Sequence, residues 1–131
     1  MAKKQKTLAK LKKELDVVHH RFIRQRDSED GFFTCISSGR RLPVSQMHAG
    51  HFYASTFTRT RWDDRNVNGQ SAGDNVFKHG NLLNYRRGML ARYGQGTLDE
   101  LEALHNQEFK PDRQWLEERI KYYKDKLNNS I

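Results

Sequence analysis

The middle of the chain holds five residues of the types that can cleave a phosphodiester: His48, His51, Asn66, Asn75 and His79. A neutral histidine can take a proton from water near pH 7. An amide placed across from it can fix the tautomer and orientation of its ring, and a polar group at the start of a following helix can hold a divalent cation. Taken alone this pattern is weak, because any one of these histidines is more often a hydrogen-bonded structural residue.

Their order along the chain is that of a ββα-metal (His-Me finger) nuclease. We assign His51 as the general base and Asn66 as the residue that orients it. The candidate ligands of a single Mg²⁺ or Mn²⁺ are His48, Asn75 and His79, although a phosphate contact or a surface position is the preferred interpretation of His79. Because a regular strand would put His48 and His51 on opposite faces, we expect a bulge at Gly50 to turn both inward.

Short extended pieces between helices must position these residues. Apolar spacing predicts a helix over residues 7–26, extended pieces over 32–57, a polar loop with a short strand over 54–73, and helix from Asp74 to Gly94 with a break at Gly80. A capping box at Thr97 and Glu100 predicts the start of a short helix, and Pro111-Asp112 predicts the start of a final one.

We therefore expect an α+β fold with a small ββα-metal (HNH) unit between an N-terminal amphipathic helix and C-terminal helices. The expected organisation is a single domain over residues 1–131. It would comprise a basic N-terminal helical arm over 1–30, an HNH-like ββα core over 31–94 and C-terminal helices over 95–131.

Composition points to a polyanionic partner. The chain has 131 residues, 24 Lys and Arg against 16 Asp and Glu, and a formal net charge of +8, a field that draws phosphate. No apolar run approaches the ~20 residues needed to span a bilayer, and no signal-peptide pattern follows the basic start. A lone cysteine, Cys35, excludes an intrachain disulfide and favours the reducing cytoplasm.

Basic residues concentrate around the proposed site. Between Ile36 and Gln95 there are nine Lys and Arg residues against three acidic ones. Trp62 could either stack on an unpaired base or fill the core, and the Lys-rich start from Lys3 to Lys13 could be a solvated face or an arm that binds the phosphate backbone. The candidate DNA contacts are Arg40, Arg41, Arg59, Arg61, Arg65, Lys78, Arg86 and Arg87.

Several motifs together resemble one known family. They are Cys-Ile-Ser-Ser-Gly at residues 35–39, Met-His-Ala-Gly-His-Phe at 47–52, Arg-Asn-Val-Asn-Gly-Gln at 65–70, Asp-Asn-Val-Phe-Lys-His-Gly-Asn-Leu at 74–82, Tyr-Arg at 85–86 and Arg-Tyr-Gly-Gln at 92–95. They resemble the centre of the NinG/Rap phage recombination endonucleases, and the similarity extends over residues 8–127. The His-Ala-Gly-His box combined with Lys-x-Gly-Asn-Leu is far more specific than a generic HNH pattern.

The resemblance implies an HNH-type nuclease that acts on branched recombination intermediates such as D-loops and Holliday junctions. By position, His51 matches the general base of the family, Asn66 the central asparagine, and Asn75 the third residue on the metal side. Two departures weaken the match near the site. Asn68 stands where relatives commonly have His, and Asn84 stands where they commonly have Glu.

The family's structural zinc is the other departure. Its two Cys-x-x-Cys pairs correspond here to Cys35 with Ser38 and to Ser71 with Asp74. One thiol, one carboxylate and two neutral hydroxyls are a poor ligand set for zinc, which prefers four thiolate or imidazole ligands. We predict that this structural zinc is lost, and that Ser38, Ser71 and Asp74 form a hydrogen-bond network that ties the hairpin to the helix start.

Three hypotheses remain. The first is a metal-dependent endonuclease of phage or prophage recombination, working in the host bacterial cytoplasm on branched or partly single-stranded DNA. The second is a DNA-binding recombination accessory protein that keeps the HNH fold with impaired catalysis, and the third is a basic structural module. A homodimer and a recombinase partner are further expectations of the nuclease hypothesis, whereas a membrane is not. Convergence of His51 and Asn75 on one open cavity would exclude the third, whereas a His51 buried against apolar side chains, or an Asn66 that points away from it, would contradict the first.

Overall fold

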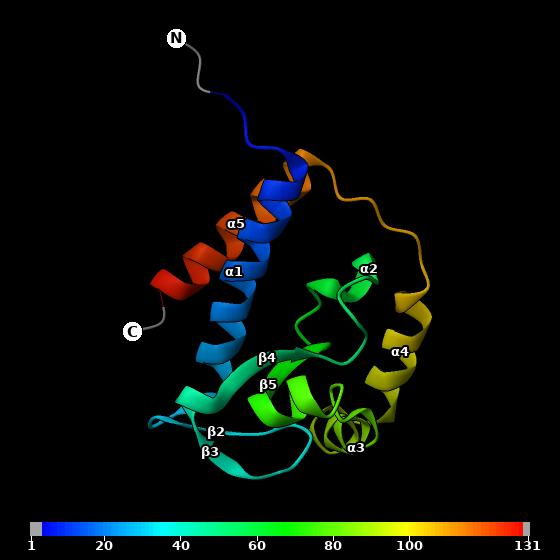
Figure 1. Cartoon of the computed structure of the whole chain (residues 1–131). Coiled ribbons are helices and arrows are strands. Elements are labelled where there is room, and N and C mark those ends of the chain that lie inside the picture. Colours follow the sequence, from blue (N-terminus) through cyan, green and yellow to red (C-terminus); the bar gives the residue numbers. More distant parts are fainter. Residues whose placement is uncertain (1–3, 130–131) are drawn as a thin grey trace. The chain divides into compact units, whose positions relative to one another are not determined.

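A computed structural model describes residues 4–129, and it confirms the α+β class: helices accompany two small antiparallel sheets (Figure 1). Lys3 of the proposed basic arm lies outside the described residues. The chain divides into two units. Unit 1 comprises the residues up to Phe22 together with those from Lys110 onward, and unit 2 comprises Ile23–Phe109. Within the described residues, no helix has both the length and the apolar character needed to cross a membrane.

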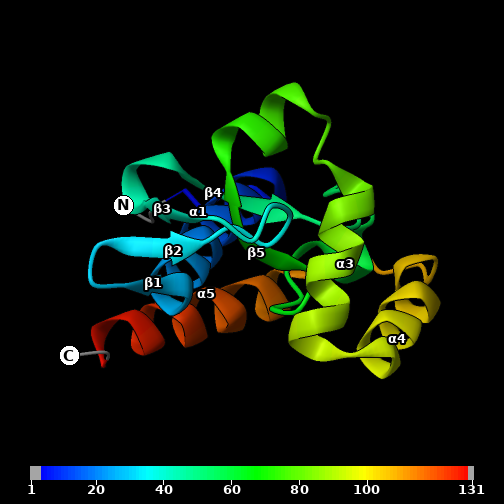
Figure 2. The same ribbon diagram turned by 90° about the horizontal axis from the view of Figure 1, so that it is seen from below.

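Unit 1 is built from two helices that lie side by side (Figures 1 and 2). They are the first part of α1 (Leu8–Asp27) and α5 (Arg113–Asn128). Asp112 caps α5 by accepting a hydrogen bond from the Trp115 N–H at 2.8 Å, as the sequence predicted. Between the helices, the ring of Tyr123 lies 4.9 Å from that of His19.

Unit 2 holds the strands and the remaining helices. In chain order these are β1 (Ser28–Glu29), β2 (Phe32–Thr34), β3 (Arg41–Pro43), η1 (Val44–Gln46), β4 (Met47–His51), α2 (Thr58–Arg61), β5 (Val67–Ser71), the π-helical turn η2 (Gly73–Phe77), α3 (Leu82–Tyr93) and α4 (Gln95–His105). The first three strands form one sheet in the order β1-β2-β3, and β4 pairs with β5 in another. The predicted break at Gly80 separates η2 from α3.

One predicted helix start is wrong. Helix α4 begins at Gln95, so Thr97 lies inside its first turn instead of capping it. Gly94 has φ 87° and serves both as the last cap of α3 and as the first cap of α4. A left-handed glycine thus turns the chain before the capping box is reached. The polar stretch over 54–73 also contains the short helix α2 besides the expected strand β5.

Unit 2 depends on a buried carboxylate, Asp27, at the end of α1. Asp27 accepts hydrogen bonds from Arg26 Nε at 2.8 Å, from Arg92 Nη2 at 2.8 Å and from the Gly69 N–H at 2.7 Å. Burial alone would raise the pKa of Asp27, but the hydrogen bonds from Arg26 and Arg92 outweigh burial and hold the pKa below its ordinary value. The pairing joins the end of α1 to β5 and α3.

A second buried residue, Asn68 of β5, extends this network towards β4. Its Oδ1 accepts from Arg92 Nη1 at 3.1 Å and from the Tyr93 hydroxyl at 2.8 Å. Its amide nitrogen lies 3.2 Å from the hydroxyl of Tyr85, and that hydroxyl donates to the Gly50 carbonyl at 2.6 Å. Gly50 directly precedes His51, so the network fixes the backbone of the strand that carries the proposed base.

We expect the substitution Asp27→Asn to destabilise the protein by about 3 kcal/mol at pH 7, because it leaves two partly buried arginines without their counter-charge. Since the folded-state pKa of Asp27 is lowered, its stabilisation is complete above about pH 4 and is lost as the pH falls through the folded-state pKa. The measurement is urea unfolding from pH 7 to pH 3. Asp30→Asn, at an exposed turn, is the matched control; an equal loss there, or a loss independent of pH, would contradict this prediction.

Candidate functional site

A cavity of about 440 Å³ in unit 2 brings together three of the predicted site residues. His51 reaches it from the end of β4, Asn75 from η2, and His79 from the turn that follows. The full lining consists of Ala49, His51, Phe52, Tyr53, Ala54, Ser55, Phe57, Asn75, His79, Gly80 and Leu82. The structure thus brings His51 and Asn75 to one open cavity, as the nuclease hypothesis requires.

The ring of His51 is oriented by a backbone carbonyl. Its Nε2 lies 3.0 Å from the carbonyl oxygen of Arg61, and the side chain is half-buried. A carbonyl can only accept, so this contact selects the tautomer that carries its proton on Nε2. Nδ1 is then the basic nitrogen, which is the state required of a general base.

Asn66 acts on the loop that provides this carbonyl and not on the ring itself. Its Oδ1 accepts from the Tyr53 N–H at 2.8 Å, and its amide nitrogen donates to the carbonyls of Tyr53 at 3.0 Å and Thr60 at 3.1 Å. The sequence placed Asn66 across from the ring. In the structure both of its amide hydrogens go to backbone carbonyls, so it can position His51 only through the loop, whose next carbonyl belongs to Arg61.

The expected bulge at Gly50 is absent from the described strands. β4 and β5 pair residue for residue, from Met47 opposite Ser71 to His51 opposite Val67. Gly50 packs directly against the side chain of Gln70. A Cβ added at Gly50 would come 2.2 Å from Gln70 Oε1, which is too close for a side chain to fit without a shift. The regular register leaves His48 exposed and outside the cavity lining. His48 is linked to the site through Asn75, whose amide nitrogen lies 3.2 Å from His48 Nδ1.

The backbone that brings His79 to the cavity has an unusual conformation. The sequence placed it one helical turn beyond Asn75, but η2 ends at Phe77 and His79, Gly80 and Asn81 all have positive φ, of 48°, 84° and 48°. Left-handed geometry is costly for residues other than glycine and persists where the surroundings enforce it. Here the Gly80 N–H donates to the Asp74 carbonyl at 3.0 Å, which folds the turn back onto η2.

The groups that line the cavity determine whether it can hold the predicted cation. Among the described residues there is no group of three or more His, Cys, Asp and Glu side chains that could hold a metal. The cavity lining itself offers the amide oxygen of Asn75 and the ring nitrogens of His79, with no carboxylate. Mg²⁺ is usually bound by one or two protein carboxylates and completes its shell with water and substrate phosphate. Because this lining has no carboxylate, it would hold such a cation only together with the substrate phosphate.

Asp74 and Ser71, two of the positions at which the resemblance implies zinc ligands, belong to a hydrogen-bond network centred on Asp74. Its Oδ2 accepts from the Ser37 hydroxyl at 2.6 Å and from the Asn81 amide at 3.2 Å, and its Oδ1 lies 3.5 Å from Lys78 Nζ. The Asp74 N–H donates to Ser71 Oγ at 3.2 Å. Burial would raise the pKa of Asp74, but these partners lower it overall.

Ser37 therefore takes the place in this network that the sequence assigned to Ser38. The hydroxyl of Ser38 instead accepts from the Arg40 N–H at 3.2 Å within the turn, and its side chain is exposed. Cys35 lies beneath the network, where its sulfur accepts from the Ser71 N–H at 3.3 Å. With one thiol and with the carboxylate already bonded to a neighbouring hydroxyl, the donor set does not fit a tetrahedral zinc.

The predicted DNA contacts divide into exposed and structural residues. Arg65 is structural, because it pairs with Asp63 at 3.0 Å and also with Glu100. Arg61 is half-buried, with its guanidinium 4.8 Å from the ring centre of Trp62, and Trp62 itself is buried, so it belongs to the core. The remaining six are exposed: Arg40, Arg41, Arg59, Lys78, Arg86 and Arg87.

Sequence reasoning did not predict that Asn68 and Gln70, like Asn66, are buried amides that hold the site together. Asn66, Asn68 and Gln70 occupy alternate positions along the chain into β5, and all three are fully buried. Alternation places them on one face of the strand. The signal was a polar side chain at every second position where a core strand normally carries apolar residues.

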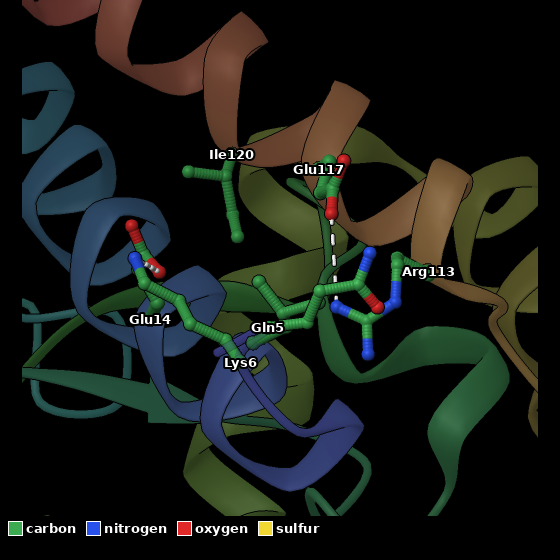
Figure 3. A pocket seen from close by; sticks show the side chains of 7 residues that line it. Gln5, Lys6, Glu14, Arg113, Glu117 and Ile120 are labelled. Carbon is green, nitrogen blue, oxygen red and sulfur yellow. Dashed lines mark hydrogen bonds and ion pairs between the residues drawn. The ribbon is translucent and has the colours of Figure 1, made fainter. Parts of the chain in front are cut away.

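A second cavity, of about 290 Å³, lies in unit 1 (Figure 3). Its charged groups are engaged with one another: Glu14 bonds Lys6 at 2.9 Å, and Arg113 lies 3.8 Å from Glu117. Apart from these ion pairs its lining is formed by Gln5, Leu11 and Ile120. This lining lacks the histidine and amide pair that makes the first cavity a candidate for hydrolysis.

Comparisons with known proteins identify the family of the chain. The family model described as "NinG: Bacteriophage Lambda NinG protein" matches residues 1–130. Relatives named "Protein ninG" include those of Enterobacteria phage H19B, 36% identical over 111 residues (84% of this chain and 51% of the relative), and of Escherichia phage lambda, 38% identical over 86 residues (65% and 40%).

The protein of the same name from Salmonella phage P22 is 33% identical over 111 residues, 84% of this chain and 50% of the relative. The chain thus spans about half the length of the curated relatives it matches. No solved structure gives a significant match. Since the family model covers nearly the whole sequence, the chain belongs to the NinG family.

Proposed function

We propose that this protein is a metal-dependent DNA endonuclease in which His51 activates the attacking water. The observation that carries the proposal is the convergence of a carbonyl-oriented histidine with Asn75 and His79 on one open cavity. The chain order β4, β5, η2 agrees with a ββα HNH unit, and β5 contacts η2. The six exposed candidate DNA contacts of unit 2 suit a polyanionic substrate.

In the proposed reaction, Nδ1 of His51 takes a proton from water, and the water oxygen attacks phosphorus in line. The bond between phosphorus and the leaving oxygen breaks, and that oxygen takes a proton from solvent. Asn75 and His79 would hold the Mg²⁺ or Mn²⁺. When bound, the cation stabilises the negative charge that grows on the phosphate and the leaving oxygen. His48 positions Asn75, and Asn66 positions His51 through its loop.

We further propose that the substrate is branched or partly single-stranded DNA, such as a D-loop or a Holliday junction, in the cytoplasm of a bacterial host. This follows from the resemblance noted in the sequence together with family membership. Symmetrical cutting of a four-way junction needs two active sites, so we expect a homodimer on that substrate, and a recombinase is an expected partner.

A DNA-binding accessory protein without catalysis is the second candidate. The observation that favours it is the lack of a carboxylate in the described cavity lining, because such a group would bind a cation more tightly than an amide does. The two candidates differ in whether a phosphodiester is cut.

The first experiment measures nicking of a labelled four-way junction with Mg²⁺, Mn²⁺ or EDTA. The native protein should cut only with a divalent cation, and His51→Ala should lower the rate by roughly 10²–10⁴-fold, the usual contribution of a general base. Gln46→Ala, at an exposed position before β4, is the control and should cut normally. Binding without cutting by all three proteins would instead establish the accessory role.

Asn66→Ala tests the indirect positioning of the base. It removes three hydrogen bonds to the loop, so we expect a loss of about 1–3 kcal/mol of stability. Under conditions where the variant is folded, cutting should fall while the affinity for DNA stays unchanged, because the loop carries the Arg61 carbonyl. The measurements are denaturant unfolding, nicking and fluorescence anisotropy, with the exposed Asn106→Ala as the control. Full activity in folded Asn66→Ala would exclude this role.

A further inference from the structure

Four large apolar side chains are exposed beside the candidate site. Val76, Phe77, Leu82 and Leu83 are 53%, 82%, 50% and 83% exposed. We call these four residues the apolar rim. Single exposed apolar residues are ordinary, but four of them within residues 76–83 are typical of an interaction surface. Phe77 and Leu83 are by far the most exposed large apolar residues among those described.

The apolar rim is continuous with the cavity. Leu82 lines the cavity together with His51 and His79, and Phe77 is the last residue of η2, which carries Asn75. In Figure 2 the segment between β5 and α3 stands out from the rest of unit 2. A macromolecule whose phosphate enters the cavity would therefore meet these side chains.

The segment that carries the apolar rim is anchored at its base. Gly80 and Asn81 both bond to Asp74, through its carbonyl at 3.0 Å and its carboxylate at 3.2 Å, and Asp74 is buried. Ser37 holds the same carboxylate at 2.6 Å. The exposed side chains thus project from a braced turn, which lowers the entropy cost of inserting them into a partner.

The charges around the apolar rim identify the partner. Lys78 lies within the segment, and Arg86 and Arg87 follow on α3, all three exposed. Asp74, the carboxylate that precedes them in the chain, is buried and pairs with Lys78 at 3.5 Å. Apolar side chains framed by cations suit a ligand that has both stacked apolar faces and phosphates, and DNA has both.

We propose that the apolar rim is a wedge that inserts Phe77 and Leu83 between bases at a DNA branch next to the phosphate to be cut. Side chains of this type unstack base steps in other DNA-binding proteins, and a branch point is easier to open than a continuous duplex. This inference rests on the proposed nuclease function and adds to it a physical basis for choosing branched substrates.

The test uses His51→Ala as the background, so that binding is measured without cutting. A four-way junction carries 2-aminopurine at the branch, whose fluorescence rises on unstacking, and anisotropy reports affinity for the junction and for linear duplex. The background protein should raise the fluorescence. Adding Phe77→Ser with Leu83→Ser should abolish the rise and reduce the preference for junction over duplex roughly tenfold, the scale of losing a stacked base.

Two controls accompany this test. Val17→Ser replaces a half-exposed apolar residue of α1 and should leave the fluorescence rise unchanged, and Phe77→Trp should retain it because the indole ring also stacks. An unchanged rise in the double variant would overturn the wedge. The wedge would also be overturned if sedimentation analysis found the background protein to be a dimer and the double variant a monomer. The apolar rim would then be a self-association surface.

The proposed function and the wedge fail in different ways. If the protein with His51 intact cuts the junction but the fluorescence at the branch does not change on binding, the nuclease stands and the wedge is wrong. If no variant binds or cuts the junction, the proposed function is wrong and the wedge falls with it.

Discussion

A buried negative charge at the end of α1 sets the architecture of unit 2. A carboxylate excluded from water is tolerated only when cations and N–H donors surround it, and the partners of Asp27 come from α1, β5 and α3. These elements must therefore meet at one point. The same network continues through Asn68 and Tyr85 to the carbonyl of Gly50, so the requirement to compensate one charge also fixes the strand that bears the proposed base.

The candidate site is assembled mainly from backbone carbonyls and side-chain amides. The ring of His51 is set by the carbonyl of Arg61, and the loop that bears this carbonyl is held by Asn66. Neutral dipoles of this kind orient a histidine without adding a charge beside it. Such a site leaves the electrostatics of the reaction to the substrate, to any bound cation and to the exposed cations of unit 2.

Periodicity made the helices predictable, because α1 and α5 each bury one apolar stripe. The strand carrying His51 also followed from spacing. The segment with Asn75 and His79, predicted as helix, is instead a short π-helical turn followed by residues of positive φ. What spacing could not reveal is which polar partner a side chain selects. Ser37 replaced Ser38 beside Asp74, Arg65 paired with Asp63 and Glu100, and Gly50 kept β4 regular against Gln70. Apart from the pair of Arg65 with Asp63, each of these choices depends on contacts between residues distant in sequence.

The Asn68-Gly69 pair gives the fold a chemical consequence. In a flexible chain, the backbone nitrogen of a glycine that follows asparagine readily attacks the side-chain amide and converts it into a carboxylate. In β5 the Gly69 N–H is held by Asp27 and the Asn68 amide by Tyr85, so the attacking geometry is out of reach. Folding therefore protects Asn68, on which the fold depends, from conversion into a carboxylate. A chain that stays unfolded loses the Asn68 amide irreversibly. The lifetime of the intact protein therefore depends on its rate of unfolding as well as on its stability.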